Sequence, residues 1–467
     1  MRLRLALFAL LPLAASSTAL TAGCSAAPPR QMAADDRLVI MVSVDGLAAY
    51  YLEDPKAHMP TLRRMMREGA WSEGLHGSFP SVTWPNHTTL VTGVEPARHG
   101  VLGNTYWDRA QGKIVPLIPD PLFDKDEIVK TPTLYDVAHK AGLRTAGIIW
   151  PASRNAKTLD WTMPDVKPLD LFLKYSTPEW MKELREEGLW VDQQETWCNK
   201  AGGGVQRDWL YARATAQVIR KHRPNLVLLH LVELDHVQHA DGPQSPNAYW
   251  ACSYADDRIR DLVDAVEAAG LKDRTTFLIV SDHGFVAYTK QILPNVLLRK
   301  AAMLGLEGDK IVPGQAIVVA QGGGAFVYVL DRERRSEVLG KLRAMFKDVE
   351  GVSAVIDERE FAALGIATPA QDPRAPDLAL SARDGYTFSD VAKGDAALVD
   401  VNPMKGSHGC LPSEPRMRGT FVAWGAGIKV GVKMPVFRSV DVAPTAARLL
   451  GLRLENVDGR PREEILK

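Results

Sequence analysis

The chain has 467 residues, of which 46% are hydrophobic, and its 56 basic and 56 acidic side chains give a formal net charge of zero. This length and apolar content allow a large core, more than one small domain would hold. The balanced charge gives no support for nucleic-acid wrapping or for a broad basic surface that binds membranes, so an anionic substrate would need a local source of positive charge.

The N-terminal segment is typical of an export signal. Two arginines within the first four residues precede the apolar run 5–14, and small residues then lead to Cys24. The ending Ala-Gly-Cys resembles a bacterial lipobox, but Thr21 stands where Leu is usual, so ordinary cleavage nearby stays an alternative. We therefore predict a signal peptide at 1–23 and a linker at 24–36, in an exported bacterial protein that is either periplasmic or a lipoprotein anchored through Cys24. No other stretch is long and apolar enough to span a bilayer.

Strand-like and helix-like segments alternate along the rest of the chain. Apolar runs rich in β-branched residues predict buried strands, and amphipathic segments predict helices. In chain order these are the strand Arg37–Val44, the helices Met59–Gly69 and Thr131–Gly142, the strand Thr145–Trp150, the helix Arg207–His222, the strand Asn225–Val232, the helix Tyr249–Gly270, the strands Thr275–Ser281 and Gly419–Trp424, and the helix Val440–Gly451. This alternation predicts a three-layer α/β/α sandwich around a mostly parallel central sheet, in one large domain at 37–460.

Residues 296–405 interrupt this alternation. They contain several short β-rich runs and one helix near Ser336–Phe346, which predicts a smaller α+β subdomain inserted into the large domain. Gly322–Gly324 has no Lys after it, so a turn is favoured over a phosphate-binding loop. A bridge between Cys198 and Cys252 is open in an oxidising periplasm, but the sequence does not assign it.

Acidic residues and histidines follow three of the predicted strands. They are Asp45, Asp235, His239, Asp282 and His283. The ligand site of a parallel α/β sheet lies beyond the carboxyl ends of its strands, so these side chains are expected at one edge. Asp and His together suit zinc or, less often, manganese. Asp235 and His239 are four residues apart and share one face of a helical turn, although such a pair taken alone is usually a surface feature.

The segment 80–90 places a hydroxyl at the start of a helix. Pro85 and the apolar periodicity after it predict a helix that begins near Thr83 or Trp84. A helix N-terminus presents free N–H groups and partial positive charge, which suit a phosphate. A Thr83 hydroxyl held there by a metal ion can attack phosphorus, whereas the local alternative is that Thr83 only caps the helix.

Several short motifs occur in a specific order. They are Asp45-Gly46, the run Thr83–Gly93 followed by Pro96, His99-Gly100 and Asn104, then Asp235-x-x-x-His239 with Gly242-Pro243, Asp282-His283-Gly284, and Gly406-Ser407-His408-Gly409. Together they closely resemble the nucleotide pyrophosphatase/phosphodiesterase family of the alkaline phosphatase superfamily, of the type I phosphodiesterase kind. The resemblance extends over about 37–460 and implies an alkaline phosphatase-like catalytic domain.

The resemblance implies two zinc ions, which manganese could replace. One ion would be held by Asp235, His239 and His408, and the other by Asp45, Asp282, His283 and the Thr83 hydroxyl. Thr83 would form a covalent phospho-enzyme that water hydrolyses, and Asn104 would donate a hydrogen bond to a phosphate oxygen. His408 is a ligand by resemblance alone. Three further histidines are expected to be structural or to support the ligands: His87, His99 and His236.

The nucleophile and its neighbours indicate the substrate class. The Cys/Ser-x-Pro-x-Arg context of sulfatases is absent, and related monoesterases mostly use Ser with an Arg clamp, so Thr83 with Asn104 favours diesters. Trp84 stands where relatives often carry Phe and offers a face on which a base could stack. We expect zinc-dependent hydrolysis of phosphodiester or pyrophosphate bonds in nucleotides, releasing nucleoside monophosphates, without sequence-specific nucleic-acid binding. The alternatives are a hydrolase of phosphonates, phospholipid head groups or other small phosphodiesters, and an inactive extracytoplasmic binding lipoprotein.

Overall fold

The computed structural model describes residues 36–118, 122–308 and 310–467. The predicted signal peptide 1–23 and Cys24 lie outside the described residues, as does the predicted linker up to residue 35. Among the helices of the three described ranges, none combines the length and the apolar character that crossing a bilayer requires.

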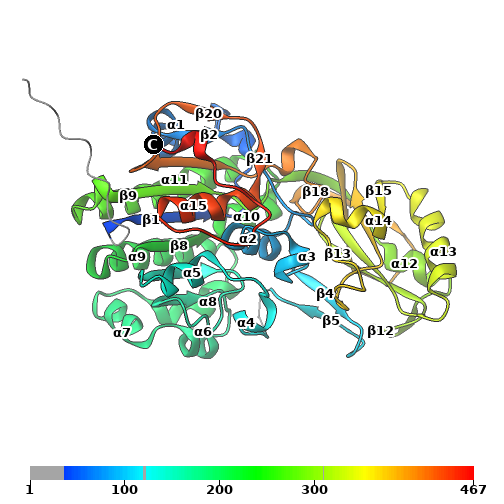
Figure 1. The fold of residues 1–467 in the computed structure, drawn as a ribbon. Helices are drawn as coiled ribbons and strands as arrows, with labels where there is room; N and C mark the ends of the chain where they lie inside the picture. The colour runs from blue at the N-terminus through cyan, green and yellow to red at the C-terminus, as the bar shows by residue number, and fades with distance from the viewer. Residues whose placement is uncertain (1–35, 119–121, 309) are drawn as a thin grey trace, which may run out of the picture.

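Within the described residues, eight strands form the central sheet of the larger part of the molecule (Figure 1). In spatial order they are β20 (Val432–Met434), β2 (Ala70–Ser72), β19 (Phe421–Gly425), β9 (Thr275–Val280), β1 (Leu38–Val44), β8 (Leu226–Leu231), β6 (Thr145–Trp150) and β7 (Trp161–Pro164). From β9 to β7 all neighbours are parallel, and β19 runs antiparallel to β9 and β2. The predicted mostly parallel sheet is therefore confirmed.

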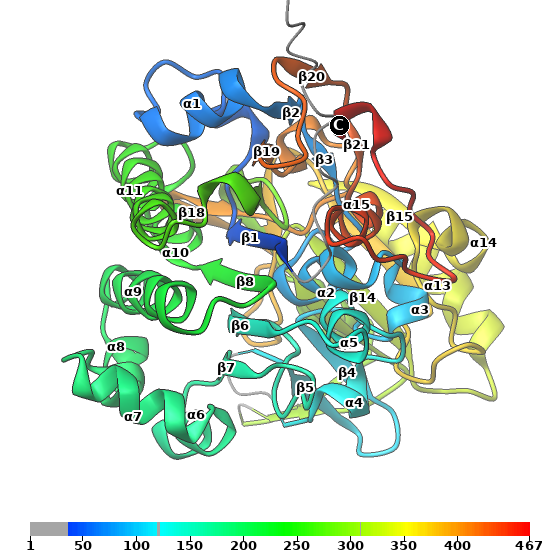
Figure 2. The same cartoon turned by 60° about the vertical axis from the view of Figure 1, so that its left-hand side comes forward.

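Helices cover both faces of this sheet and give the predicted three layers. One layer contains α1 (Pro60–Glu68), α9 (Gly204–His222) and α11 (Pro246–Ala268), and the other contains α2 (Thr83–Thr92), α5 (Leu134–Lys140) and α15 (Val442–Leu449). Figure 2 shows the sheet edge-on between α9 and α11 on the left and α5 and α15 on the right. Side chains of β1 alternate between the two layers, with Ile40 in one core and Met41 in the other.

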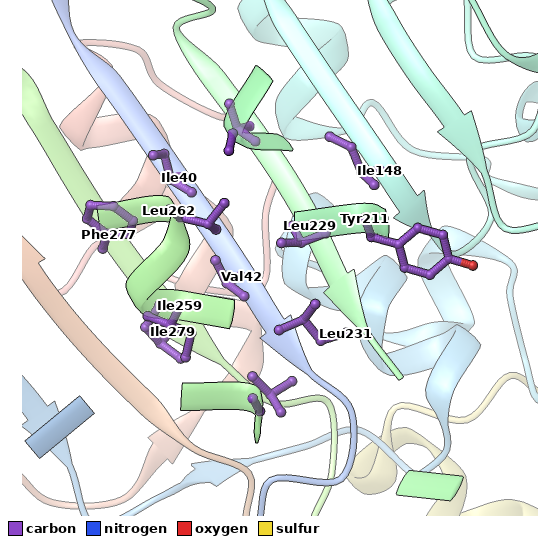
Figure 3. Close-up of a cluster of buried hydrophobic side chains, with 14 of the residues drawn as sticks. Ile40, Val42, Ile148, Tyr211, Leu229, Leu231, Ile259, Leu262, Phe277 and Ile279 are labelled. Carbon is purple, nitrogen blue, oxygen red and sulfur yellow. The ribbon is translucent and has the colours of Figure 1, made fainter. Parts of the chain in front are cut away.

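Apolar side chains of the three middle strands hold the strand ends in register. Ile40, Leu229 and Ile279 come from β1, β8 and β9 and belong to one buried cluster with Leu262 of α11 (Figure 3). Each of these four side chains is fully buried. Burying an aliphatic side chain of this size contributes roughly 1.5–3 kcal/mol to the free energy of unfolding. This packing stabilises the strands whose carboxyl ends precede the site.

A second, antiparallel sheet lies beside the larger part (Figure 1), within the segment where the sequence predicts an inserted subdomain. Its strands, in spatial order, are β13 (Ala316–Gln321), β14 (Gly324–Val329), β16 (Leu378–Ala382) and β15 (Val352–Asp357). The predicted helix is α13 (Arg335–Lys347), which packs on this sheet. Three further strands connect the two parts: β10 (Val286–Ile292), β17 (Gly385–Phe388) and β18 (Leu398–Ser407).

The sequence pattern missed the segment between β7 and α9. It contains α6 (Leu169–Tyr175), α7 (Pro178–Glu186) and α8 (Gln194–Asn199). None of these helices is longer than nine residues, so a period of 3.6 does not stand out in the sequence. The structure also leaves Cys198, Cys252 and Cys410 as free thiols, and the bridge that the sequence left open is not formed.

Candidate metal centre and nucleophile

Three adjacent strand ends gather the predicted ligands at one edge of the central sheet. β9, β1 and β8 are neighbouring parallel strands, so their carboxyl ends lie together. Asp45 follows β1, Asp282 and His283 follow β9, and α10 (Glu233–Asp241), which begins after β8, carries Asp235 and His239. This is the edge at which open α/β sheets bind their ligands.

Asp235, His239 and His408 form the first ligand group. His239 Nε2 lies 3.4 Å from Asp235 Oδ2 and 3.1 Å from His408 Nε2. His408 Nε2 lies 3.6 Å from Asp235 Oδ2. Asp235 and His239 thus share one face of α10. His408, which directly follows β18 and comes after the second sheet in the sequence, completes the group.

Asp45, Asp282 and His283 form the second ligand group. His283 Nε2 lies 3.3 Å from Asp45 Oδ1 and 3.1 Å from Asp282 Oδ2. One ligand atom of each residue lies within 4.8 Å of the others. The His283 ring stacks on the His408 ring with centroids 3.7 Å apart, so the two groups adjoin and form one centre.

Hydrogen bonds fix the tautomer of the three histidines. Nδ1 of His239 faces the Gly406 carbonyl oxygen at 3.1 Å, Nδ1 of His283 faces that of Gly284 at 3.1 Å, and Nδ1 of His408 faces that of Ser81 at 3.0 Å. A carbonyl oxygen only accepts, so each Nδ1 carries a proton and each neutral ring has its lone pair on Nε2. All three lone pairs therefore point into the ligand groups.

Burial decides the charge states in the centre. Desolvation lowers the pKa of His283 to about 4 and that of His408 to about 3, so both rings are neutral at pH 7. Desolvation also raises the pKa of Asp45 well above its usual range, with further increases from the nearby Asp282 and Asp235 carboxylates. Neutral imidazoles and crowded carboxylates are an arrangement that a cation would stabilise.

Four ligand atoms of the centre are buried and have no hydrogen-bond partner among the described residues. They are Asp45 Oδ1, Asp235 Oδ2, Asp282 Oδ2 and His283 Nε2. An unsatisfied buried polar group costs roughly 1–3 kcal/mol, and more when it is charged. Carboxylate oxygens with imidazole nitrogens are a donor set for zinc and similar divalent ions. The residues present therefore fit a metal centre.

Thr83 is the first residue of α2, and contacts of the backbone around it link the start of this helix to both ligand groups. The preceding Ser81 carbonyl is bound by His408, and the Thr83 carbonyl accepts from His87 Nδ1 at 2.9 Å. His87 Nδ1 also lies 3.5 Å from Asp282 Oδ2. The N-cap residue of α2 is Val82, which makes no capping bond, so the alternative that Thr83 only caps this helix is wrong.

Asn104 lies against the first turn of α2. Its Oδ1 accepts a hydrogen bond from the Trp84 backbone N–H at 3.0 Å. This bond uses the acceptor of the amide and turns the Nδ2 donor the other way; within the described ranges Nδ2 has no partner. Asn104 thus offers a free N–H donor beside Trp84, the residue that follows Thr83.

Trp84 is enclosed by the protein itself. The side chain is 1% exposed and packs in a cluster that includes Val101, Tyr106, Val115 and Ala152. The stacking role predicted for Trp84 therefore finds no open face in this conformation. The size of the indole could be seen in the sequence, but its burial depends on packing against β4 (Thr105–Asp108) and β5 (Lys113–Pro116).

Buried histidines around the centre support the ligands. His230 Nε2 contacts Asp45 Oδ2 at 2.9 Å, while His230 Nδ1 faces the Ile149 carbonyl at 3.1 Å. His230 was not among the residues predicted from the sequence, where its only signal is a histidine inside the apolar run of β8. Two other histidines contact no ligand: His99 Nε2 lies 3.1 Å from Thr89 Oγ1, and His236 Nε2 lies 3.2 Å from an Arg207 nitrogen.

A sequence model of the family described as "Type I phosphodiesterase / nucleotide pyrophosphatase" matches residues 39–411. An uncharacterised pyrophosphatase/phosphodiesterase of Schizosaccharomyces pombe is 27% identical over 249 residues, which cover 53% of this chain and 44% of the relative. Human ectonucleotide pyrophosphatase/phosphodiesterase family member 1 is 24% identical over 433 residues, covering 88% of this chain and 40% of the relative. The chain thus spans less than half the length of these two curated relatives.

Solved structures of similar fold are also known. An inactive variant of murine ectonucleotide pyrophosphatase/phosphodiesterase 5, in complex with AMP, superposes with a TM-score of 0.68 and 19% sequence identity. The match covers 92% of this chain and 100% of the murine chain. At this identity the likeness shows a shared fold.

Proposed function

The chain belongs to the type I phosphodiesterase/nucleotide pyrophosphatase family, and we propose that it hydrolyses phosphodiester and pyrophosphate bonds of nucleotides with Thr83 as the covalent nucleophile. The observation that carries this proposal is the pair of adjoining ligand groups, with unsatisfied buried atoms, both of which have contacts to residues around the start of α2. A binding protein without catalytic activity would not need these metal ligands to lie together. The hypothesis of an inactive binding lipoprotein therefore has less support than that of an enzyme.

Two zinc ions are the proposed cofactors. One would be held by Asp235, His239 and His408, and the other by Asp45, Asp282, His283 and the Thr83 hydroxyl. Bound ions of this kind supply positive charge that stabilises phosphoryl oxygens and lowers the pKa of a hydroxyl.

The residues of this chain do the rest of the chemistry. The Thr83 hydroxyl gives up its proton as Oγ1 attacks phosphorus, the bond from phosphorus to the leaving oxygen breaks, that oxygen departs and takes up a proton from water, and the phosphoryl group stays on Thr83. Water then breaks the bond between phosphorus and Thr83 Oγ1 and releases the monophosphate. The Thr83 backbone N–H and the Asn104 Nδ2 donor are the groups at the start of α2 that can bind phosphoryl oxygens, because the Trp84 N–H donates to Asn104 and Pro85 has no N–H. The low exposure of Thr83, 7%, limits competing water.

Other small phosphodiesters are the second candidate substrate class, and the burial of Trp84 favours it. A nucleotide pocket built on base stacking needs an exposed aromatic face beside the nucleophile. Trp84 offers none at 1% exposure. Phosphonates, phospholipid head groups and choline-type esters would not depend on that face.

The test is a panel of substrates assayed with added zinc. The panel contains chromogenic phosphodiesters, dinucleotides, ATP, phosphocholine esters and monoesters, compared by kcat/KM. We expect diesters and nucleotides to be cleaved and monoesters to be poor, because Asn104 and α2 offer too little charge for a dianion. Thr83→Ala should lower kcat by roughly a thousandfold or more, as for other covalent nucleophiles.

A matched control separates nucleophile loss from damage to α2. Thr92 lies on the same helix, is also buried, and donates its hydroxyl to the Thr88 carbonyl at 2.7 Å. Thr92→Ala should keep most of the activity. Equal turnover by Thr83→Ala and the unaltered protein would remove the nucleophile assignment, and no diester cleavage by the unaltered protein would remove the proposed activity.

A further inference from the structure

The hairpin between β13 and β14 reaches from the second sheet to the candidate site. Gln321, the last residue of β13, is 3% exposed. Gln321 Oε1 accepts a hydrogen bond from the Asn104 backbone N–H at 3.0 Å, and Gln321 Nε2 donates to the Thr105 carbonyl at 2.7 Å. One amide from 217 residues away in sequence therefore satisfies the backbone on both sides of the Asn104 side chain.

Asn104 is consequently held at two points. Its backbone is held by Gln321, and its side-chain oxygen accepts from the Trp84 N–H at 3.0 Å. Because both bonds are fixed, the Nδ2 donor has one direction left. The approach is close: a Cβ at Gly103 would lie 2.8 Å from Gln321 Oε1, so a larger residue would push the amide away.

The same hairpin also holds the loop that carries His408. The Gly323 N–H donates to the His408 carbonyl at 2.5 Å. Cβ atoms at Gly322 and Gly324 would collide with the His408 and Gly409 carbonyl oxygens, so this contact requires glycine. The turn at the hairpin tip thus joins the Asn104 loop to a proposed metal ligand.

We infer that Gln321 is a positioning residue, which fixes the Asn104 amide for its contact with the phosphoryl group beside Thr83. The inference rests on the proposed function, because it needs Asn104 to contact the substrate. Without the Gln321 amide, the Asn104 N–H and the Thr105 carbonyl lose their partners and the loop is free to shift. A displacement of about 1 Å in a positioning contact can cost roughly a hundredfold in rate.

The test compares Gln321→Met with Gln315→Met in the zinc-loaded full-length protein. Methionine matches the length of glutamine but forms none of the hydrogen bonds of the Gln321 side chain, which include one from Nε2 to Thr105 Oγ1 at 3.1 Å. Gln315 directly precedes β13, and its side-chain oxygen has no partner in the described part of the chain. We expect Gln321→Met to lower kcat for a chromogenic diester by roughly ten- to a hundredfold, with KM and zinc content little changed. Gln315→Met should keep kcat within about twofold of the unaltered protein.

A double-mutant cycle with Asn104→Ala distinguishes positioning from general damage. If Gln321 acts through Asn104, Gln321→Met should cost little once Asn104 is alanine. Losses that multiply in the double variant would overturn the inference, as would a Gln321→Met variant with unaltered kcat.

The proposed function can fail separately from this inference. If the unaltered protein cleaves no diester, the function is wrong and the cycle has no basis. If the unaltered protein and Asn104→Ala differ strongly but Gln321→Met behaves like Gln315→Met, the function stands and the positioning role is wrong. Thermal unfolding of each variant shows whether the fold is kept, so that a folded Gln321→Met variant with a lower kcat supports the role.

Discussion

His239 Nε2 and His408 Nε2 face each other at 3.1 Å, although the two residues are 169 positions apart in the chain. Both rings have a carbonyl oxygen on Nδ1, so in the neutral tautomers neither Nε2 carries a proton to share. Two lone pairs that close together repel each other unless a cation lies between them. This contact is the strongest local indication of a metal ion in the first ligand group.

The first prediction is that metal binding supports folding. A ligand at about 1,000 times its Kd adds roughly 4 kcal/mol to the free energy of unfolding, so a chelator should lower the Tm and zinc should restore it. His408→Ala should remove one equivalent of metal by elemental analysis and should weaken the response of the Tm to zinc. His222 pairs with Glu183 at 2.6 Å on the far end of α9, so His222→Ala should bind as much metal as the unaltered protein. Equal metal content in the two variants would contradict the ligand role of His408.

The second prediction concerns His230 on β8. Its Nε2 contacts Asp45 Oδ2 at 2.9 Å, which leaves Asp45 Oδ1 facing the second ligand group. Removing a partner that orients a metal ligand typically costs 10–100-fold in metal affinity or activity, and we expect about that loss for His230→Leu. His99→Leu is the control, because His99 is also fully buried but contacts Thr89 rather than a ligand. Zinc titration followed by activity measures the difference, and equal zinc affinities in the two variants would refute the role.

The parts of the site that follow strands could be predicted from the sequence. Asp45 and Asp282 stand directly after apolar runs, and parallel strands bring such positions to one edge whatever the loops do. The spacing of Asp235 and His239 likewise places them on one helical face. These inferences need only the period of a strand or a helix.

The remaining features depend on contacts between distant segments. His408 reaches the centre because β18 and the glycine-rich hairpin hold its loop, and no local pattern specifies that path. His230 lies inside an apolar run, where a histidine counts as core. The burial of Trp84 follows from the β4–β5 hairpin that covers it. Sequence periodicity carries no information about such packing. Only the family resemblance therefore indicated His408, and neither the role of His230 nor the burial of Trp84 was predicted.

The third prediction is export, which stays a prediction because 1–23 and Cys24 lie outside the described residues. We propose a lipoprotein, with ordinary periplasmic export as the alternative. Expression in a Gram-negative host with radioactive palmitate should label the unaltered protein and leave Cys24→Ser unlabelled. The unaltered protein should be found in the membrane fraction, and Cys24→Ser should not. An unlabelled, soluble periplasmic product would favour ordinary cleavage, and a cytoplasmic one would refute the signal.

The fourth prediction concerns Asp372, which joins the second sheet to the loop after α3 (Pro96–His99). Its carboxylate accepts from Lys130 Nζ at 2.8 Å and from Arg374 Nη2 at 2.7 Å, and its side chain is 5% exposed. Burial raises the pKa of this carboxyl, but the hydrogen bonds from Arg374 and Lys130 outweigh it and lower the pKa to about 2. A lowered pKa in the folded state means that the native protein holds fewer protons than the unfolded chain between about pH 4 and pH 2.

Asp372 should therefore stabilise the fold fully above about pH 4, and the contribution should disappear as the pH falls through about 2. A shift of this size corresponds to about 2 kcal/mol. Urea unfolding with a chelator present, at pH values from 7 to 2, should show Asp372→Asn less stable by about that amount at pH 7 and the two curves converging at low pH. Asp395, whose side chain is 92% exposed, is the control, and Asp395→Asn should follow the unaltered protein throughout. A constant difference between Asp372→Asn and the unaltered protein down to pH 2 would mean that packing, and not the charge of the carboxylate, is what the substitution removes.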